Sequence, residues 1–130
     1  MAASGKAVKA GWVISILASL MFVFSASMKF VGGPELAKGM EHLELAKIPV
    51  IPLAILELTC VAVYLIPATS VLGAILLTGY LGGAMLTHWR VGDPFIVHIL
   101  LGMAIWLGIY LREDRLRALI PTRRPVSTLP

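Results

Sequence analysis

The chain has 130 residues, of which 58% are hydrophobic and 14% are charged, and its mean hydropathy is +0.90. A soluble domain of this length needs a more polar surface, so the composition excludes a water-soluble protein and predicts one lipid-embedded domain with at most about five membrane spans. The net charge of +4 does not indicate nucleic-acid binding, because the basic residues lie at the ends of apolar segments, where they meet lipid headgroups.

The first apolar segment covers residues 11–31 and follows a short lead that carries Lys6 and Lys9. A basic lead before an apolar stretch also fits a cleaved signal peptide. This stretch is longer than a usual signal core and runs on to Lys29, which favours a retained span. One face of the predicted helix is mostly small and suits close packing against a neighbouring helix. Its residues are Ser15, Ser19, Phe22, Ala26 and Lys29.

Residues 32–47 form the only long polar connection. Pro34 suits the first turn of a short helix, and we expect this helix to lie on the membrane surface. His42 belongs to its wet side. The residues predicted to share its other face are Leu36, Met40, Leu43 and Lys47.

The second apolar segment, residues 48–66, carries one carboxylate, Glu57, near its middle. A charge at that depth is unfavourable by roughly 2.5–3.5 kcal/mol, so we expect Glu57 to face protein or water rather than lipid. The single cysteine, Cys60, lies one turn further along. Because the chain has no second cysteine, an internal disulfide is excluded. A lone cysteine in a span is usually an inert packing residue.

A short link after Pro67 leads to the third segment, residues 69–88, and makes these two spans antiparallel neighbours. Gly79 and Gly83 form a GxxxG pair, which predicts close packing against another helix. The fourth segment covers residues 95–111. Residues 112–130 are predicted to be a cytoplasmic tail, which begins as a charged amphipathic continuation of this span and is disordered over residues 121–130.

The lysine and arginine residues predict the orientation of the four spans. Seven lie at the two termini, against four near the other membrane face. By the positive-inside rule we expect both termini to be cytoplasmic. The expected location is the cell (inner) membrane, as a multi-pass protein. Glu57 and Tyr80 then lie about 13 and 12 Å below the outer ends of their helices, in one layer, where a hydrogen bond between them is feasible. The inner half of the bundle is nearly devoid of ionisable side chains, whereas the outer half collects a set of polar and ionisable ones: Lys29, Glu57, Tyr80, Thr87, His88, Arg90 and His98.

These residues are the candidate site. Glu57, His88 and His98 are the candidates for catalysis, and the ligand-binding candidates are Lys29, Tyr80, Thr87 and Arg90. Each also has a simpler interpretation: the Glu57 carboxyl ties helices together, Lys29 extends to the headgroups, and His88 is an interfacial residue. Two histidines flanking a turn suggest a metal or haem, but no third ligand has a recognisable spacing, so we predict no metal site and leave the cofactor open.

Three stretches carry a family resemblance: SMKFVGGPE at residues 27–35, LELTCVAVYLIP at 56–67, and GAILLTGYLGGAMLTHWRVGDP at 73–94. In order, spacing and span number the chain resembles the DoxX-like family of small four-span membrane proteins. By position, the resemblance singles out Lys29, Glu57 and His88. It also implies a link to membrane redox complexes, because relatives include a membrane subunit of a thiosulfate:quinone oxidoreductase.

The sequence therefore predicts an all-α integral membrane four-helix bundle with a short interfacial helix between spans one and two. The leading functional hypothesis is an accessory or small-ligand-binding component linked to membrane redox or quinone chemistry through Glu57. One alternative is a non-catalytic assembly factor that docks a partner through its glycine-rich third span. Another is a membrane isomerase or hydrolase of a hydrophobic small molecule. Expected partners are the lipid bilayer, a quinone or similar molecule, and a second copy or a partner subunit.

Overall fold

The computed structural model describes residues 3–125, and this part of the chain is helical without strands. The predicted all-α class is confirmed. The helices in chain order are α1 (Gly5–Val31), α2 (Pro34–His42), α3 (Val50–Leu65), the 3₁₀ helix η1 (Pro67–Thr69), α4 (Ser70–Arg90), α5 (Ile96–Arg112) and α6 (Asp114–Leu119).

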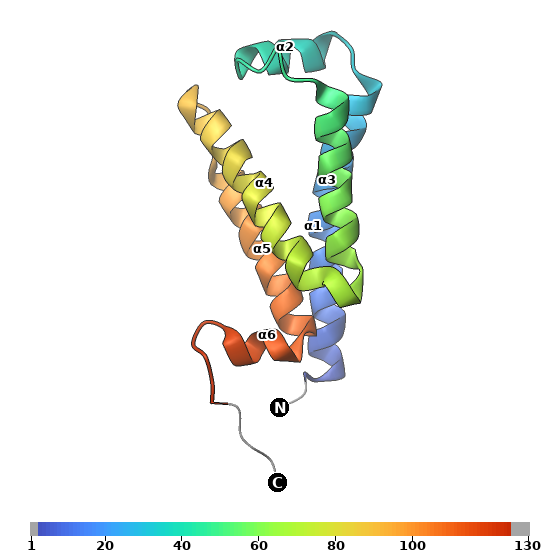
Figure 1. Cartoon of the computed structure of the whole chain (residues 1–130), viewed down its shortest axis with the longest axis vertical. Helices are drawn as coiled ribbons and strands as arrows, with labels where there is room; N and C mark the ends of the chain where they lie inside the picture. The colour runs from blue at the N-terminus through green and yellow to red at the C-terminus, as the bar shows by residue number, and fades with distance from the viewer. Residues whose placement is uncertain (1–2, 126–130) are drawn as a thin grey trace.

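Four long helices run lengthwise through the molecule. α1 packs against α3 and α5, and α4 packs against the same two, so that α1 and α4 lie diagonally opposite each other. Figure 1 shows that the helices converge at the end where the N-terminus lies and diverge toward α2, with α1 and α3 on one side and α4 and α5 on the other. The bundle is thus narrow at one end and wide at the other.

Glycines explain the narrow end, because only a residue without a side chain permits such close helix contacts. A Cβ atom added to Gly73 on α4 would lie 2.2 Å from the backbone of Tyr64 on α3. A Cβ added to Gly11 on α1 would lie 2.7 Å from the carbonyl oxygen of Gly108 on α5. Both contacts bring helix backbones together at the same end of the bundle.

Tyr64 is the centre of this narrow end and is fully buried. Its hydroxyl donates to the carbonyl of Ile105 on α5 at 2.7 Å and shares a 3.0 Å hydrogen bond with the Ser15 hydroxyl on α1. Arg112 donates to the Tyr64 carbonyl at 3.0 Å and lies 4.2 Å from the ring centre of Trp12. One tyrosine therefore joins α1, α3 and α5, while Gly73 brings in α4.

Gly79 and Gly83 do not make the predicted close contact with another helix of this chain. A Cβ added to either glycine meets no atom within 4 Å, because these residues lie where α4 has already diverged from its neighbours. The missing side chains leave open space at the wide end instead of a packed interface.

The exterior of the bundle is apolar and its interior holds polar groups, the reverse of a water-soluble protein. Phe24 is 66% exposed and Met103 is 63% exposed, whereas Glu57 and Ser15 are buried. Two helical segments, Gly5–Val31 and Pro67–Arg90, are long and apolar enough to cross a bilayer. α3 and α5 are also apolar but have 16 and 17 residues, or about 25 Å of helix, slightly less than the ~30 Å hydrocarbon core. The arrangement is compatible with a helical membrane bundle.

The two short helices lie across the ends of the bundle (Figure 1). Gly32 and Gly33 turn the chain into α2 with φ values of +70° and +103°, which favour glycine. The prediction that Lys47 shares a face of this helix is wrong, because α2 ends at His42. The charged continuation predicted after the fourth span is a separate short helix, α6, because the extended backbone of Glu113 separates it from α5. The predicted disordered tail lies partly outside the described residues.

Candidate functional site

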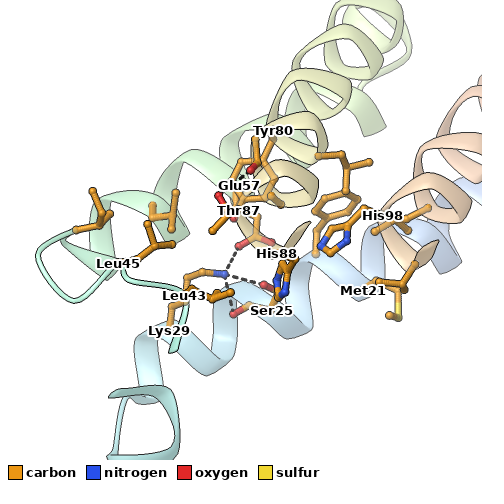
Figure 2. Close-up of a pocket in the computed structure, with 18 of the residues that line it drawn as sticks. Met21, Ser25, Lys29, Leu43, Leu45, Glu57, Tyr80, Thr87, His88 and His98 are labelled. Carbon is orange, nitrogen blue, oxygen red and sulfur yellow. Dashed lines mark hydrogen bonds and ion pairs between the residues drawn. The ribbon is translucent and has the colours of Figure 1, made fainter. Parts of the chain in front are cut away.

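A pocket of about 550 Å³ occupies the wide end of the bundle, between α1, α3, α4 and α5. Figure 2 shows its polar side chains, to which all four helices contribute. The contribution of α5 is His98. Met40, Leu43 and Leu45, at the end of α2 and just after it, complete the wall. Most of the lining is apolar, and its polar members are Ser25, Lys29, Glu57, Tyr80, Thr87, His88 and His98.

An ion pair between α1 and α3 forms one side of the pocket (Figure 2). The Lys29 ammonium donates to the Glu57 carboxylate at 2.8 Å and to the Ser25 hydroxyl at 2.7 Å. The Glu57 side chain is 2% exposed and the Lys29 side chain 12%. Lys29 therefore turns inward instead of extending to the headgroups, and the two charges compensate each other. A pocket whose charges cancel in this way suits an uncharged ligand.

Tyr80 and two glycines of α4 form the opposite side. Tyr80 lies beside Glu57 (Figure 2) and packs edge-on against Phe22, with the ring centres 6.3 Å apart. Glu57 accepts a 2.8 Å hydrogen bond from Lys29, and Tyr80 lies beside the same carboxylate, in the common layer predicted from the span lengths. Gly79 and Gly83 line the same wall, and their lack of side chains adds to the volume of the pocket.

Two histidines lie together at the end of the pocket nearest the turn between α4 and α5. The rings of His88 on α4 and His98 on α5 are 4.8 Å apart, centre to centre. The His88 Nδ1 lies 3.2 Å from the Asp93 carboxylate. The His98 Nδ1 is buried and has no hydrogen-bond partner within residues 3–125. His98 also lines a shallower groove of about 370 Å³ on the outer face of α4 and α5, beside Gly82.

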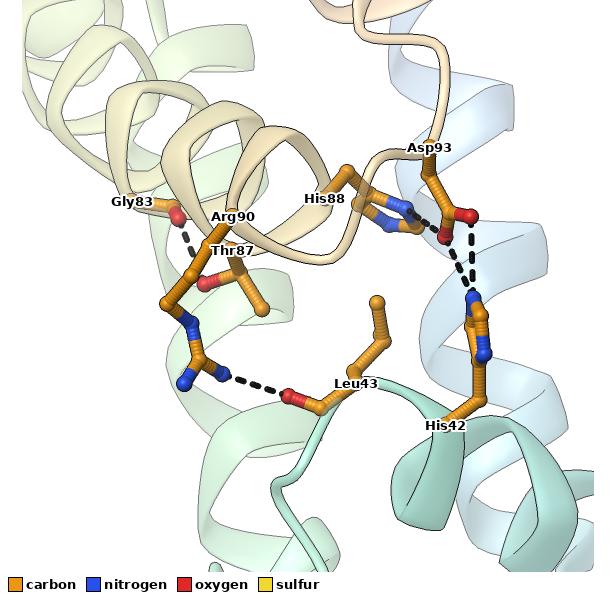
Figure 3. A network of polar contacts seen from close by, with 7 residues as sticks. All are labelled: His42, Leu43, Gly83, Thr87, His88, Arg90 and Asp93. Carbon is orange, nitrogen blue, oxygen red and sulfur yellow. Dashed lines mark hydrogen bonds and ion pairs between the residues drawn. The ribbon is translucent and has the colours of Figure 1, made fainter.

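A polar network, which we call the outer network, lies at the wide end of the bundle and joins the residues around His42 to those around Asp93 and Arg90 (Figure 3). The His42 Nε2 contacts both oxygens of Asp93, at 2.9 and 3.0 Å. Arg90 donates to the Leu43 carbonyl and to the Glu44 carboxylate, each at 2.7 Å. These bonds attach the connection after α2 to the turn between α4 and α5. The hydrogen bond from His42, reinforced by the one from His88, lowers the pKa of Asp93 below its ordinary value.

Six of the seven candidate residues line one pocket: Lys29, Glu57, Tyr80, Thr87, His88 and His98. Arg90 is the exception, because its guanidinium belongs to the outer network and not to the wall. Thr87 donates to the Gly83 carbonyl of its own helix at 2.8 Å, which satisfies its hydroxyl hydrogen.

Sequence reasoning missed three residues of the site. Ser25 precedes Lys29 by one helical turn, and that spacing was a usable signal. Asp93 looked like an ordinary turn residue, and the role of His42 depends on how α2 folds back over the bundle. Within the described range, no group of three or more His, Cys, Asp or Glu side chains is arranged to hold a metal ion.

Comparison with known proteins identifies a family. A family model described as the DoxX-like family matches residues 13–110, a range that includes every polar residue of the pocket wall. No curated protein and no solved structure matches the chain.

Proposed function

The chain belongs to the DoxX-like family of membrane-associated proteins, and on that premise we propose that its pocket binds a small, hydrophobic, uncharged molecule of membrane redox or quinone chemistry. The observation that carries the proposal is the pocket itself, in which an ion pair and two histidines are set into a mostly apolar wall. Such a combination binds an apolar body and orients a polar head.

The proposed setting is the inner cell membrane, with α1, α3, α4 and α5 as four spans and both termini in the cytoplasm. The apolar exterior of these helices and the excess of basic residues at the termini support this arrangement. The pocket and α2 then lie toward the outer face. A ligand dissolved in the bilayer reaches the pocket between helices whose outer halves diverge.

In this proposal Glu57 is the proton-binding group and Lys29 its counter-ion. The 2.8 Å contact keeps the carboxylate in place, and Tyr80 and the histidines surround the volume where a ligand head would lie. Groups of this kind exchange protons with an oxygen-bearing ligand when its redox state changes. The protein would then act as an accessory component that holds such a molecule for a redox partner.

Ligand titration tests the proposal. A short-chain quinone or quinol, added to purified protein in detergent, should bind the wild type and bind Gly83→Leu at least tenfold more weakly, because the new side chain fills the pocket. Gly82→Leu is the matched control, since this neighbouring glycine faces the shallow outer groove. Equal binding by both variants and the wild type would refute the pocket as the site.

The alternative of partner docking through α4 predicts the opposite pattern. Gly79 and Gly83 line the pocket, so a partner on the outer face of α4 would meet Gly82. If the protein is an assembly factor, Gly82→Leu should disrupt a complex recovered from membranes, and Gly83→Leu should leave it intact.

A further inference from the structure

The hydrogen bonds of Asp93 determine where the proton sits on His88. The pKa of Asp93 is lowered by its bonds from His42 and His88, so at neutral pH it is a carboxylate and only accepts hydrogen bonds. Its Oδ2 atom lies 3.2 Å from the Nδ1 atom of His88. The Nδ1 atom must therefore carry the hydrogen.

A neutral imidazole has one N–H, and the other ring nitrogen is an acceptor. With the hydrogen on Nδ1, the Nε2 atom of His88 carries a lone pair. The His88 side chain is 32% exposed and lines the pocket, and its Nε2 atom has no hydrogen-bond partner among the described residues. The nearest ring, that of His98, is stacked at a tilt 4.8 Å away and does not occupy this acceptor.

We propose that the ligand of this pocket carries a hydroxyl group that donates a hydrogen bond to the Nε2 atom of His88. The chemical class is a hydroquinone, phenol or alcohol on an apolar body, in contrast to a molecule with only carbonyl or ether oxygens. Asp93 is the positioning residue that keeps His88 in the accepting tautomer. This inference rests on the proposed function, since it specifies the ligand of the same pocket.

The arrangement also favours one redox form of a quinone ligand over the other. A carbonyl oxygen facing the Nε2 lone pair places two acceptors together without a hydrogen between them, which is unfavourable in an apolar pocket. A hydroxyl in the same place makes a bond and has its proton aligned toward an imidazole that accepts it. The reduced form of a quinone therefore binds more tightly than the oxidised form.

The tautomer is testable without any ligand. Nitrogen-15 spectra of histidine-labelled protein, recorded slightly above neutral pH, distinguish the two neutral tautomers from the doubly protonated ring. His42→Gln and His98→Gln identify the His88 signals by elimination. We expect the hydrogen on Nδ1 in the wild type and a shift toward Nε2 in Asp93→Asn, whose amide can donate to Nδ1. A hydrogen on Nε2, or on both nitrogens, in the wild type would overturn the inference.

Binding of two matched probes tests the ligand class. A methylated hydroquinone with a short isoprenoid tail has the donor, and its dimethyl ether keeps the same ring and tail but has no hydroxyl group; it is larger by one methyl group at each oxygen, so the comparison with Asp93→Asn separates the hydrogen bond from the difference in size. The wild type should bind the hydroquinone roughly tenfold or more tightly, and Asp93→Asn should abolish that preference. Glu41→Gln, which removes an exposed acidic residue of α2 and leaves the network intact, is the control and should keep the preference.

The outcomes separate the two levels of the proposal. Equal affinity for both probes in the wild type overturns the hydroxyl inference and leaves ligand binding in the pocket standing. If neither probe binds while the His88 hydrogen is on Nδ1, the proposed function itself fails.

Discussion

Removing one partner of the Lys29–Glu57 pair should destabilise the protein far more than removing both. The two charged atoms are 2.8 Å apart, and the Glu57 carboxylate is 2% exposed, so neither water nor another cation compensates its charge once Lys29 is lost. Breaking a buried ion pair in this way costs about 3–5 kcal/mol. We expect Lys29→Met near the upper end of that range. Glu57→Gln should lie near the lower end, because the ammonium keeps its 2.7 Å bond to Ser25 and is 12% exposed.

The double variant Lys29→Met with Glu57→Gln should recover most of the loss and lie within about 1 kcal/mol of the wild type, because no uncompensated charge remains. Reversible unfolding in mixed detergent micelles, followed by circular dichroism, measures all four corners of this cycle. The exposed pair Glu35 and Lys38 is the matched control. Its side chains are 86% and 75% exposed and 3.7 Å apart, so the equivalent substitutions should change stability by about 0–1 kcal/mol.

Additive effects would refute this reasoning. If Lys29→Met and Glu57→Gln each cost less than about 1 kcal/mol and the double variant costs their sum, the two charges are not a buried pair.

Three further predictions address the helix contacts, the outer network and the topology. Gly73→Ala should destabilise by about 1–3 kcal/mol or more, because its Cβ would lie 2.2 Å from the Tyr64 backbone, whereas Gly79→Ala in open space should not destabilise; similar losses in both would contradict the assigned contacts. The folded-state pKa of Asp93 is lowered, so its contribution to stability is present above its ordinary pKa of 3.8 and is lost as the pH falls through the folded value. Unfolding measured against pH should therefore show wild type and Asp93→Asn converging in acid, and a constant difference would contradict the network. In a Cys60→Ser background, a membrane-impermeant maleimide should label Lys38→Cys in intact cells and Arg123→Cys only after permeabilisation, and the reverse pattern would exclude cytoplasmic termini.

Much of the bundle was predictable because lipid restricts what a helix can expose. The small face of the first span packs inward as expected, with Ser15, Ser19, Phe22 and Ala26 all buried. Glu57 faces protein because it lies in the middle of an apolar span, where a charge needs a partner. Its partner, Lys29, was predicted to lie in the same half of the bundle, because the first span ends there.

The details of the pocket depend on where the helices diverge, and no local sequence pattern predicts that. A GxxxG pair has the same sequence whether it lies in a tight contact or beside open space. Gly79 and Gly83 line open space because Gly73 and Tyr64 bring α3 and α4 together at the other end. Arg90 was placed in the site by depth, yet its side chain bonds to the connection after α2, whose fold over the bundle the sequence did not reveal.

The most direct test of the pocket as a ligand site is extraction of small molecules from gently purified protein. Wild type and Gly82→Leu should each carry a hydroxyl-bearing apolar molecule in amounts comparable to the protein, detected by mass spectrometry of the solvent extract. Gly83→Leu, folded to the same degree by circular dichroism, should carry at least tenfold less, since its side chain occupies the pocket. Equal content in all three proteins would contradict a binding site at the wide end of the bundle.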